Sequence, residues 1–132
     1  MKIILIAVIV VVFLLVVVPR TLISLKASKM KGKDAPNTHA ASRERIMSGN
    51  KTVLYFSTPS CGACKKQTPI IQRIKQKYPD AVFAIDASVD RETARSYGVW
   101  GVPYTAFINE GKVISAKTGF QSDAVFEEFF QN

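Results

Sequence analysis

The chain has few of the residues that build metal and haem sites. Its 132 residues include two cysteines and one histidine. A structural zinc site takes four Cys or His ligands, so this chain would need a second chain to hold zinc. Haem attachment to a Cys-x-x-Cys pair needs a histidine directly after the second cysteine, and Lys65 stands there. The sequence therefore predicts no metal and no haem.

Charged and polar side chains are absent from residues 3–18, and apolar residues resume between residues 22 and 25, after Arg20. Sixteen helical residues span about 24 Å, less than a hydrocarbon core of about 30 Å. The helix is therefore expected to reach residue 25, with Arg20 extending to the interface. A cleaved signal peptide is the alternative, but its apolar core is shorter and ends at small residues, whereas Leu25 and Lys26 stand near the candidate cleavage site. The prediction is a transmembrane anchor over residues 1–25.

The net charge of +8 is unevenly distributed. Residues 1–33 hold six Lys or Arg and no acid, while residues 34–132 hold twelve basic against ten acidic residues, a net charge of +2. Nucleic-acid binding is therefore not indicated. Residues 26–37 are predicted to be a basic linker, whose lysines would meet anionic lipid head groups or act as a solvated tether. The positive-inside rule places the following domain in the cytoplasm.

The two cysteines, Cys61 and Cys64, lie between a strand-like and a helix-like run. Free backbone N–H groups and the positive dipole end in the first turn of a helix stabilise a thiolate. A second cysteine three positions later lies one turn further along the same helix, close enough to attack a mixed disulfide. The spacing favours a dithiol redox centre, although it does not by itself exclude an accidental pair.

The apolar periodicity predicts an α/β fold. Helices are expected over residues 38–47, capped by Thr38, over 61–77 with Pro69 inside, and over 90–97 and 122–130. Strands are expected over residues 52–57, 81–86, 104–109 and 112–117, the last two joined by the turn Glu110-Gly111. Right-handed crossovers make the first strands parallel and the hairpin antiparallel. The expected result is a small mixed sheet flanked by helices on both faces.

Residues 50–132 resemble thioredoxin. The resemblance rests on motifs that recur in order: Phe56, Cys61-Gly62-x-Cys64-Lys65, Pro69, Ile85-Asp86, Tyr97-Gly98-Val99-x-Gly101-Val102-Pro103, Glu110-Gly111-Lys112 and Gly119. It implies a thioredoxin-like domain, which we place at residues 38–132. Anchored domains of this kind are more often exported, which conflicts with the charge rule, so the facing compartment stays open.

The resemblance also implies roles for single residues. Cys61 is expected to be the exposed nucleophile and Cys64 the more buried resolving thiol. Val102-Pro103 is expected to be a cis-proline whose backbone pairs with a substrate strand; the alternative is an ordinary loop proline. Trp100 is either a substrate contact or a side chain packed at the edge of the core.

Several positions depart from the family. Thioredoxins have a buried aspartate six residues before the first cysteine, where Tyr55 stands here, and the lysine that partners it falls at Val82. A tyrosine, with a pKa near ~10, is no base at neutral pH. Two family tryptophans are Ser57 and Ser60, which predicts a smaller, more polar recognition surface, and Ala63 replaces a proline that influences the redox potential.

The sequence also gives expectations for the two lysines after the cysteines, for the C-terminal phenylalanines and for the histidine. Lys65 and Lys66 either favour the thiolate or form a solvated face. The C-terminal phenylalanines Phe126, Phe129 and Phe130 are predicted to be core. His39 is expected to have no role.

The predicted function is a membrane-anchored thiol–disulfide oxidoreductase that reduces protein disulfides without a cofactor. Its partners would be a disulfide-containing client, a protein electron donor and membrane lipid. An oxidase or isomerase of the same fold, or a redox-silent adaptor that holds a client at the membrane, is the alternative.

Overall fold

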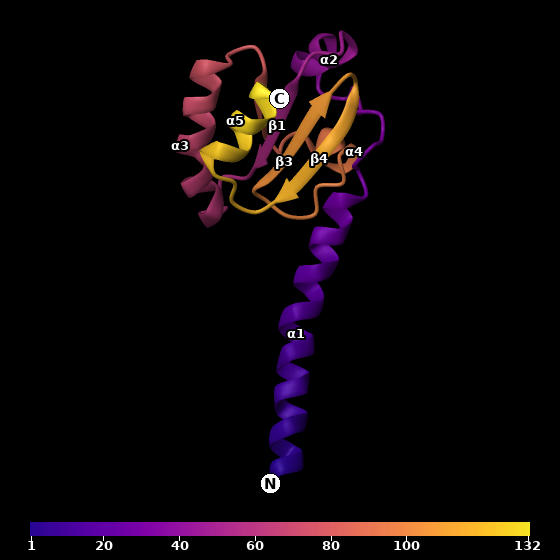
Figure 1. Ribbon diagram of the computed structural model, residues 1–132, viewed down its shortest axis with the longest axis vertical. Helices are drawn as coiled ribbons and strands as arrows, with labels where there is room; N and C mark the ends of the chain where they lie inside the picture. Colours follow the sequence, from indigo (N-terminus) through magenta and orange to yellow (C-terminus); the bar gives the residue numbers. More distant parts are fainter.

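Figure 1 shows a computed structural model of the chain, with one long helix leading into a domain of strands and helices. The structure describes residues 1–18 and 29–132 in full, and the side chains of residues 19–28 are not described. The predicted interfacial Arg20 and the first linker lysine, Lys26, lie outside the described residues.

The four strands form one mixed sheet. They are β1 (Thr52–Ser57), β2 (Val82–Asp86), β3 (Tyr104–Asn109) and β4 (Lys112–Thr118). Their order in space is β2-β1-β3-β4; β1 is parallel to β2, and the pairs β1–β3 and β3–β4 are antiparallel. The parallel pair is joined by a helical crossover, as parallel strands require. This confirms the predicted α/β fold with a mixed sheet.

Helices cover both faces of the sheet. After α1 they are α2 (Ala40–Met47), α3 (Gly62–Lys77), α4 (Arg91–Ser96) and α5 (Asp123–Gln131). Figure 1 shows α3 and α5 together on one side of the sheet and α4 on the other. Because alternate strand residues point to opposite faces, β1 feeds two separate cores. Val53 and Tyr55 belong to the core under α3 and α5, and Leu54 and Phe56 to the opposite one.

The C-terminal phenylalanines lie where the sequence predicts them. Phe126 is fully buried and its ring centroid lies 5.6 Å from that of Phe107 on β3. Phe129 and Phe130 are partly buried against the same core. They therefore hold α5 on the sheet.

The hairpin between β3 and β4 depends on one glycine. Glu110 and Gly111 have φ values of 51° and 73°. Positive φ at both central residues is the geometry of the two-residue turns that match the twist of a hairpin. Glycine adopts it without steric cost, so Gly111 accounts for the short turn.

The start of α2 corrects a prediction. His39, and not Thr38, occupies the N-cap position, and it makes no side-chain capping bond. The Thr38 hydroxyl lies 3.0 Å from the Ser96 hydroxyl instead. The His39 ring, expected to have no role, packs against Phe83 with centroids 5.8 Å apart.

The segment after α1 also differs from its prediction. Residues 26–37 were predicted to be a linker, yet Met30 is buried in the core beside α4 and β4. The Gly32 N–H donates to the Val113 carbonyl at 2.7 Å, and the Val113 N–H donates to the Lys33 carbonyl at 2.9 Å. Asp34 then forms an antiparallel bridge with Lys112. Residues 30–35 therefore cover the outer edge of β4. The division into a linker over residues 26–37 and a domain over residues 38–132 stays a prediction.

Helix α1 (Lys2–Ser28) extends away from the domain in Figure 1. The large apolar side chains of its first four turns are exposed. Among residues 1–18 and 29–132, none of the helices has both the length and the apolar character needed to cross a membrane. The anchor over residues 1–25 therefore stays a prediction.

Candidate active site

The two cysteines form a disulfide at the start of α3. Cys61 is the N-cap residue and Cys64 lies in the first turn, with their Cα atoms 5.2 Å apart. The Cys64 backbone N–H donates to the Cys61 sulfur at 3.1 Å. Cys61 is partly exposed, whereas Cys64 is only 3% exposed. Cys61 is therefore the cysteine that a second protein can reach, and its sulfur also accepts a hydrogen bond from the N-terminus of α3.

Tyr55 lies beneath the cysteines, at the position of the family's aspartate. Its side chain is buried, and its hydroxyl donates to the Cys64 carbonyl at 3.4 Å. Burial raises the pKa of Tyr55 above its usual value. Val82, at the position of the family's lysine, is fully buried and apolar. Tyr55 is therefore a neutral hydrogen-bond donor at physiological pH.

The proline loop lies at the same end of the sheet as the cysteines. Phe56, near the end of β1, pairs with Tyr104, the first residue of β3. The preceding bond, Val102-Pro103, is cis. Pro103 is buried, Val102 is half-buried, and Trp100 is 71% exposed. A client contact and a side chain packed at the edge of the core both stay predictions for Trp100.

Gln67 is a buried polar residue of this site that the sequence reading missed. It is fully buried one turn after Cys64. Its amide nitrogen donates to the Gln121 carbonyl at 3.0 Å, and its amide oxygen accepts from the Gln121 N–H at 2.6 Å. A signal was present, because position 67 continues the buried stripe of α3 that includes residues 64, 70, 71 and 74.

The loop that Gln67 holds also contacts the proline loop. The Gly119 N–H donates to the Pro103 carbonyl at 2.7 Å. The Gln121 side chain in turn donates to the Gly119 carbonyl at 3.2 Å. A chain of hydrogen bonds therefore joins the helix that carries the cysteines to the loop that carries Pro103.

The remaining predicted positions are mostly exposed. Lys65, Lys66, Ser60 and Ala63 are exposed, and Ser57 is half-buried.

In the part of the chain that the structure describes, no three His, Cys, Asp or Glu side chains come together as metal ligands would.

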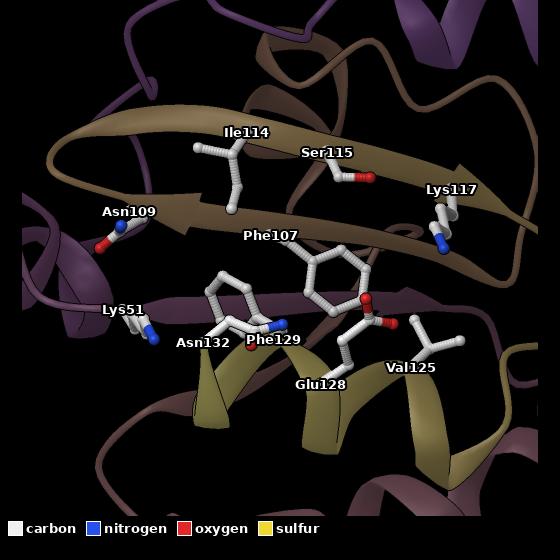
Figure 2. Close-up of a pocket in the computed structure, with 10 residues that line it drawn as sticks. All are labelled: Lys51, Phe107, Asn109, Ile114, Ser115, Lys117, Val125, Glu128, Phe129 and Asn132. Atoms are coloured by element: carbon white, nitrogen blue, oxygen red, sulfur yellow. The ribbon is translucent and has the colours of Figure 1, made fainter.

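A pocket of about 360 Å³ lies elsewhere, between α5 and the β3–β4 hairpin. Figure 2 shows Phe107 and Phe129 within it and Lys51 and Lys117 toward its two ends. None of the predicted site residues lines it. The cysteines therefore do not take part in this pocket.

The thioredoxin family model matches residues 35–132. The chain belongs to the thioredoxin family. It is 31% identical over 75 residues to thioredoxin of Bacillus subtilis, which covers 55% of this chain and 72% of that protein. The structure of Fasciola hepatica thioredoxin superposes with a TM-score of 0.59 at 26% identity and covers 70% of this chain and 92% of that one. Oxidized mitochondrial thioredoxin 3 of Saccharomyces cerevisiae superposes with a TM-score of 0.59 at 24% identity and covers 68% and 86%.

Family membership and the disulfide between Cys61 and Cys64 establish the class of activity. This thioredoxin-family protein is a thiol–disulfide oxidoreductase.

Proposed function

We propose that this thioredoxin-family protein is a membrane-anchored reductase of protein disulfides. The observation that carries the proposal is the position of Cys61, a partly exposed residue at the N-cap of α3 whose sulfur accepts a backbone N–H. A helix N-terminus stabilises negative charge by its free N–H groups and its dipole. It therefore favours the thiolate form that a reductase needs.

Reduction takes two exchanges. The Cys61 thiolate attacks one sulfur of the client disulfide; the client S–S bond breaks, a Cys61–client disulfide forms, and the other client cysteine leaves as a thiolate. Cys64 then attacks the Cys61 sulfur, the Cys61–Cys64 disulfide forms, and the second client thiolate leaves. The client gains two electrons from the two cysteines; one proton comes from the Cys64 thiol and the other from water, which took up the Cys61 proton when its thiolate formed.

The proton of the buried Cys64 thiol has no carboxylate acceptor at position 55. Tyr55 is neutral and donates its hydrogen bond to the Cys64 carbonyl. The leaving client thiolate or water therefore takes that proton. Val102, Pro103 and Trp100 are the proposed contacts of the client chain.

Electrons must return from a second protein, because neither exchange uses a cofactor. A client with a disulfide and a donor with a dithiol are the two partners that the mechanism requires. An oxidase or isomerase would use the same sulfur geometry at a higher reduction potential.

The reduction potential of the Cys61–Cys64 pair tests the direction. We expect the full chain in detergent, equilibrated with glutathione buffers, to have a value near the ~−270 mV of thioredoxin. A value near ~−120 mV, that of a strong oxidant, would instead make the protein a disulfide donor and overturn the proposed reductase. The doubly substituted chain Cys61→Ser, Cys64→Ser cannot form the disulfide and gives the signal in the absence of this redox pair.

We further propose that α1 anchors the domain to a membrane. In its support, residues 3–18 are entirely apolar and their large side chains are mostly exposed. A helix of 27 residues is about 40 Å long, more than a hydrocarbon core of about 30 Å. Lys29, Lys31 and Lys33 follow it with exposed side chains, where they can meet lipid phosphates.

Alkaline extraction of membranes tests the anchor. The full chain is expected to stay in the membrane pellet, because an apolar helix in lipid resists carbonate. A fragment of residues 29–132, expressed in the same cells, is the matched control and is expected in the supernatant. Release of the full chain would contradict anchoring.

A further inference from the structure

The pocket between α5 and the β3–β4 hairpin has the composition of a small-molecule site. Its volume of about 360 Å³ lies within the range of ligand pockets, about 300–1,000 Å³. Such pockets are mostly apolar and carry a few polar groups that orient the ligand. Here apolar side chains from β3, β4 and α5 form the walls, and a lysine lies toward each end (Figure 2).

A β-bulge in the hairpin brings two neighbouring side chains of β4 to this pocket. Phe107 pairs with Ser115, whereas the next residue of β3, Ile108, pairs with Val113. Ile114 is therefore the extra residue of the bulge. Successive side chains of a regular strand point to opposite faces, yet Ile114 and Ser115 both line the pocket. The Ile114 side chain remains 40% exposed there.

The other apolar walls are fixed by the core beneath α5. Phe107 is only 2% exposed, and its ring centroid lies 5.2 Å from that of Phe129 in an edge-to-face arrangement. Val125 and Phe129 are partly buried against the same core. An apolar ligand in this pocket would therefore cover side chains that the fold leaves partly exposed, which is favourable in water.

Lys51, the residue before β1, is held at one end of the pocket. Its half-buried side chain places the ammonium 5.9 Å from the centroid of the Phe129 ring, and the ammonium donates to the Phe130 carbonyl at 3.4 Å. An ammonium has three N–H donors, so two remain for a ligand. Figure 2 shows Asn109 and Asn132 at the same end, where their side-chain amides offer further donors.

The charge of the pocket differs between its two ends. In the part of the chain that the structure describes, the two ion pairs link α3 to α5 and involve neither lysine of the pocket. Glu128 lies toward Lys117 in Figure 2 and can offset its charge. The pocket has no acidic lining residue at the end of Lys51. One end therefore keeps a positive charge beside apolar walls.

We propose that this pocket binds an amphipathic carboxylate, a molecule with an apolar body and one carboxylate group. The carboxylate binds the Lys51 ammonium, and the body packs against Ile114 and Phe129. Charge-assisted hydrogen bonds of this kind are stronger than neutral ones, whereas a cationic ligand would meet a lysine at either end. The site lies apart from the cysteines, so it goes beyond the proposed reductase and does not depend on it.

Naphthoate and its neutral amide, naphthamide, are two probes of matched shape that test this site. The full chain is placed in nanodiscs of zwitterionic lipid, and ligand-observed NMR titrations give the dissociation constants. Empty nanodiscs of the same lipid measure the background from lipid. We expect naphthoate to bind about fivefold more tightly than naphthamide, because the carboxylate adds a charge-assisted bond at a partly exposed lysine.

Variants of the pocket locate the two ends of the ligand. Lys51→Gln is expected to lower the affinity for naphthoate about fivefold, to that of naphthamide, and Lys51→Arg to retain it. Ile114→Ser is expected to weaken both probes about threefold. The control is Lys75→Gln, which removes the same charge from an exposed residue of α3 outside the pocket and is expected to bind like the parent.

Three results would overturn the proposal. The first is that naphthoate does not bind the parent chain, and the second is that it binds no more tightly than naphthamide. The third is an equal loss in Lys51→Gln and Lys75→Gln, which would mean that the overall charge of the domain attracts the probe. If Lys51→Gln fails to fold, the comparison of the two probes in the parent and in Ile114→Ser decides instead.

Discussion

Replacing Cys64 by serine is expected to stop turnover and to leave the client covalently attached to Cys61. Cys61 stays at the N-cap of α3 and partly exposed, so its sulfur still attacks the client. The resolving thiol is missing, however, and the mixed disulfide accumulates. Non-reducing electrophoresis and mass spectrometry of the full chain, incubated with a disulfide-containing protein, measure the adduct.

Cys61→Ser gives the complementary result. This variant is expected to form no adduct and to have no turnover above the uncatalysed rate, because Cys64 is only 3% exposed. Ser48→Ala, exposed at the C-cap of α2 and away from the cysteines, is the control and is expected to behave like the parent. An adduct through Cys64 in Cys61→Ser would show that the roles of the two sulfurs are reversed.

Cys61→Ser also distinguishes the proposed reductase from a redox-silent adaptor. A redox-silent adaptor would hold its client without a covalent step, and Cys61→Ser would then preserve its cellular function. For the proposed reductase, both Cys61→Ser and Cys64→Ser are expected to abolish that function.

A fragment of residues 34–132 is expected to be less stable than one of residues 29–132 by about 2.5–6 kcal/mol. The longer fragment keeps Met30 in the core, where burial of such a side chain stabilises by about 1.5–3 kcal/mol. It also keeps two backbone hydrogen bonds between residues 32–33 and Val113, each contributing about 0.5–1.5 kcal/mol. Urea unfolding of the two fragments, both of which lack α1, measures the difference.

Single substitutions in the longer fragment show how much each residue contributes to this difference in the free energy of unfolding. Met30→Ala is expected to lose about 2–4 kcal/mol, because it leaves a cavity against Gly98 and the neighbouring core. Lys31→Ala, whose side chain is exposed, is expected to change the free energy of unfolding by less than about 0.5 kcal/mol. Equal stability of the two fragments would mean that residues 29–33 do not dock on β4 in solution.

Local patterns were sufficient for the secondary structure of the domain. The predicted strands over residues 52–57 and 104–109 coincide with β1 and β3, and the predicted helix over 61–77 begins one residue before α3. In these elements the apolar residues recur with a clear period, and residues that end helices and strands stand close by in the sequence. Thr38 illustrates the limit, since its hydroxyl pairs with Ser96, 58 residues away, and not with the helix that it was expected to cap.

The sequence by itself determined the family, the redox pair and the order of strands and helices, because these depend on motifs, spacing and periodicity along the chain. Only the tertiary structure decided that Met30 joins the core, that Gln67 holds the loop after β4, and that Lys51 meets α5 and the β3–β4 hairpin in one pocket. The physical reason is that each of these depends on strand register and on contacts between residues far apart in the chain, which no local pattern encodes.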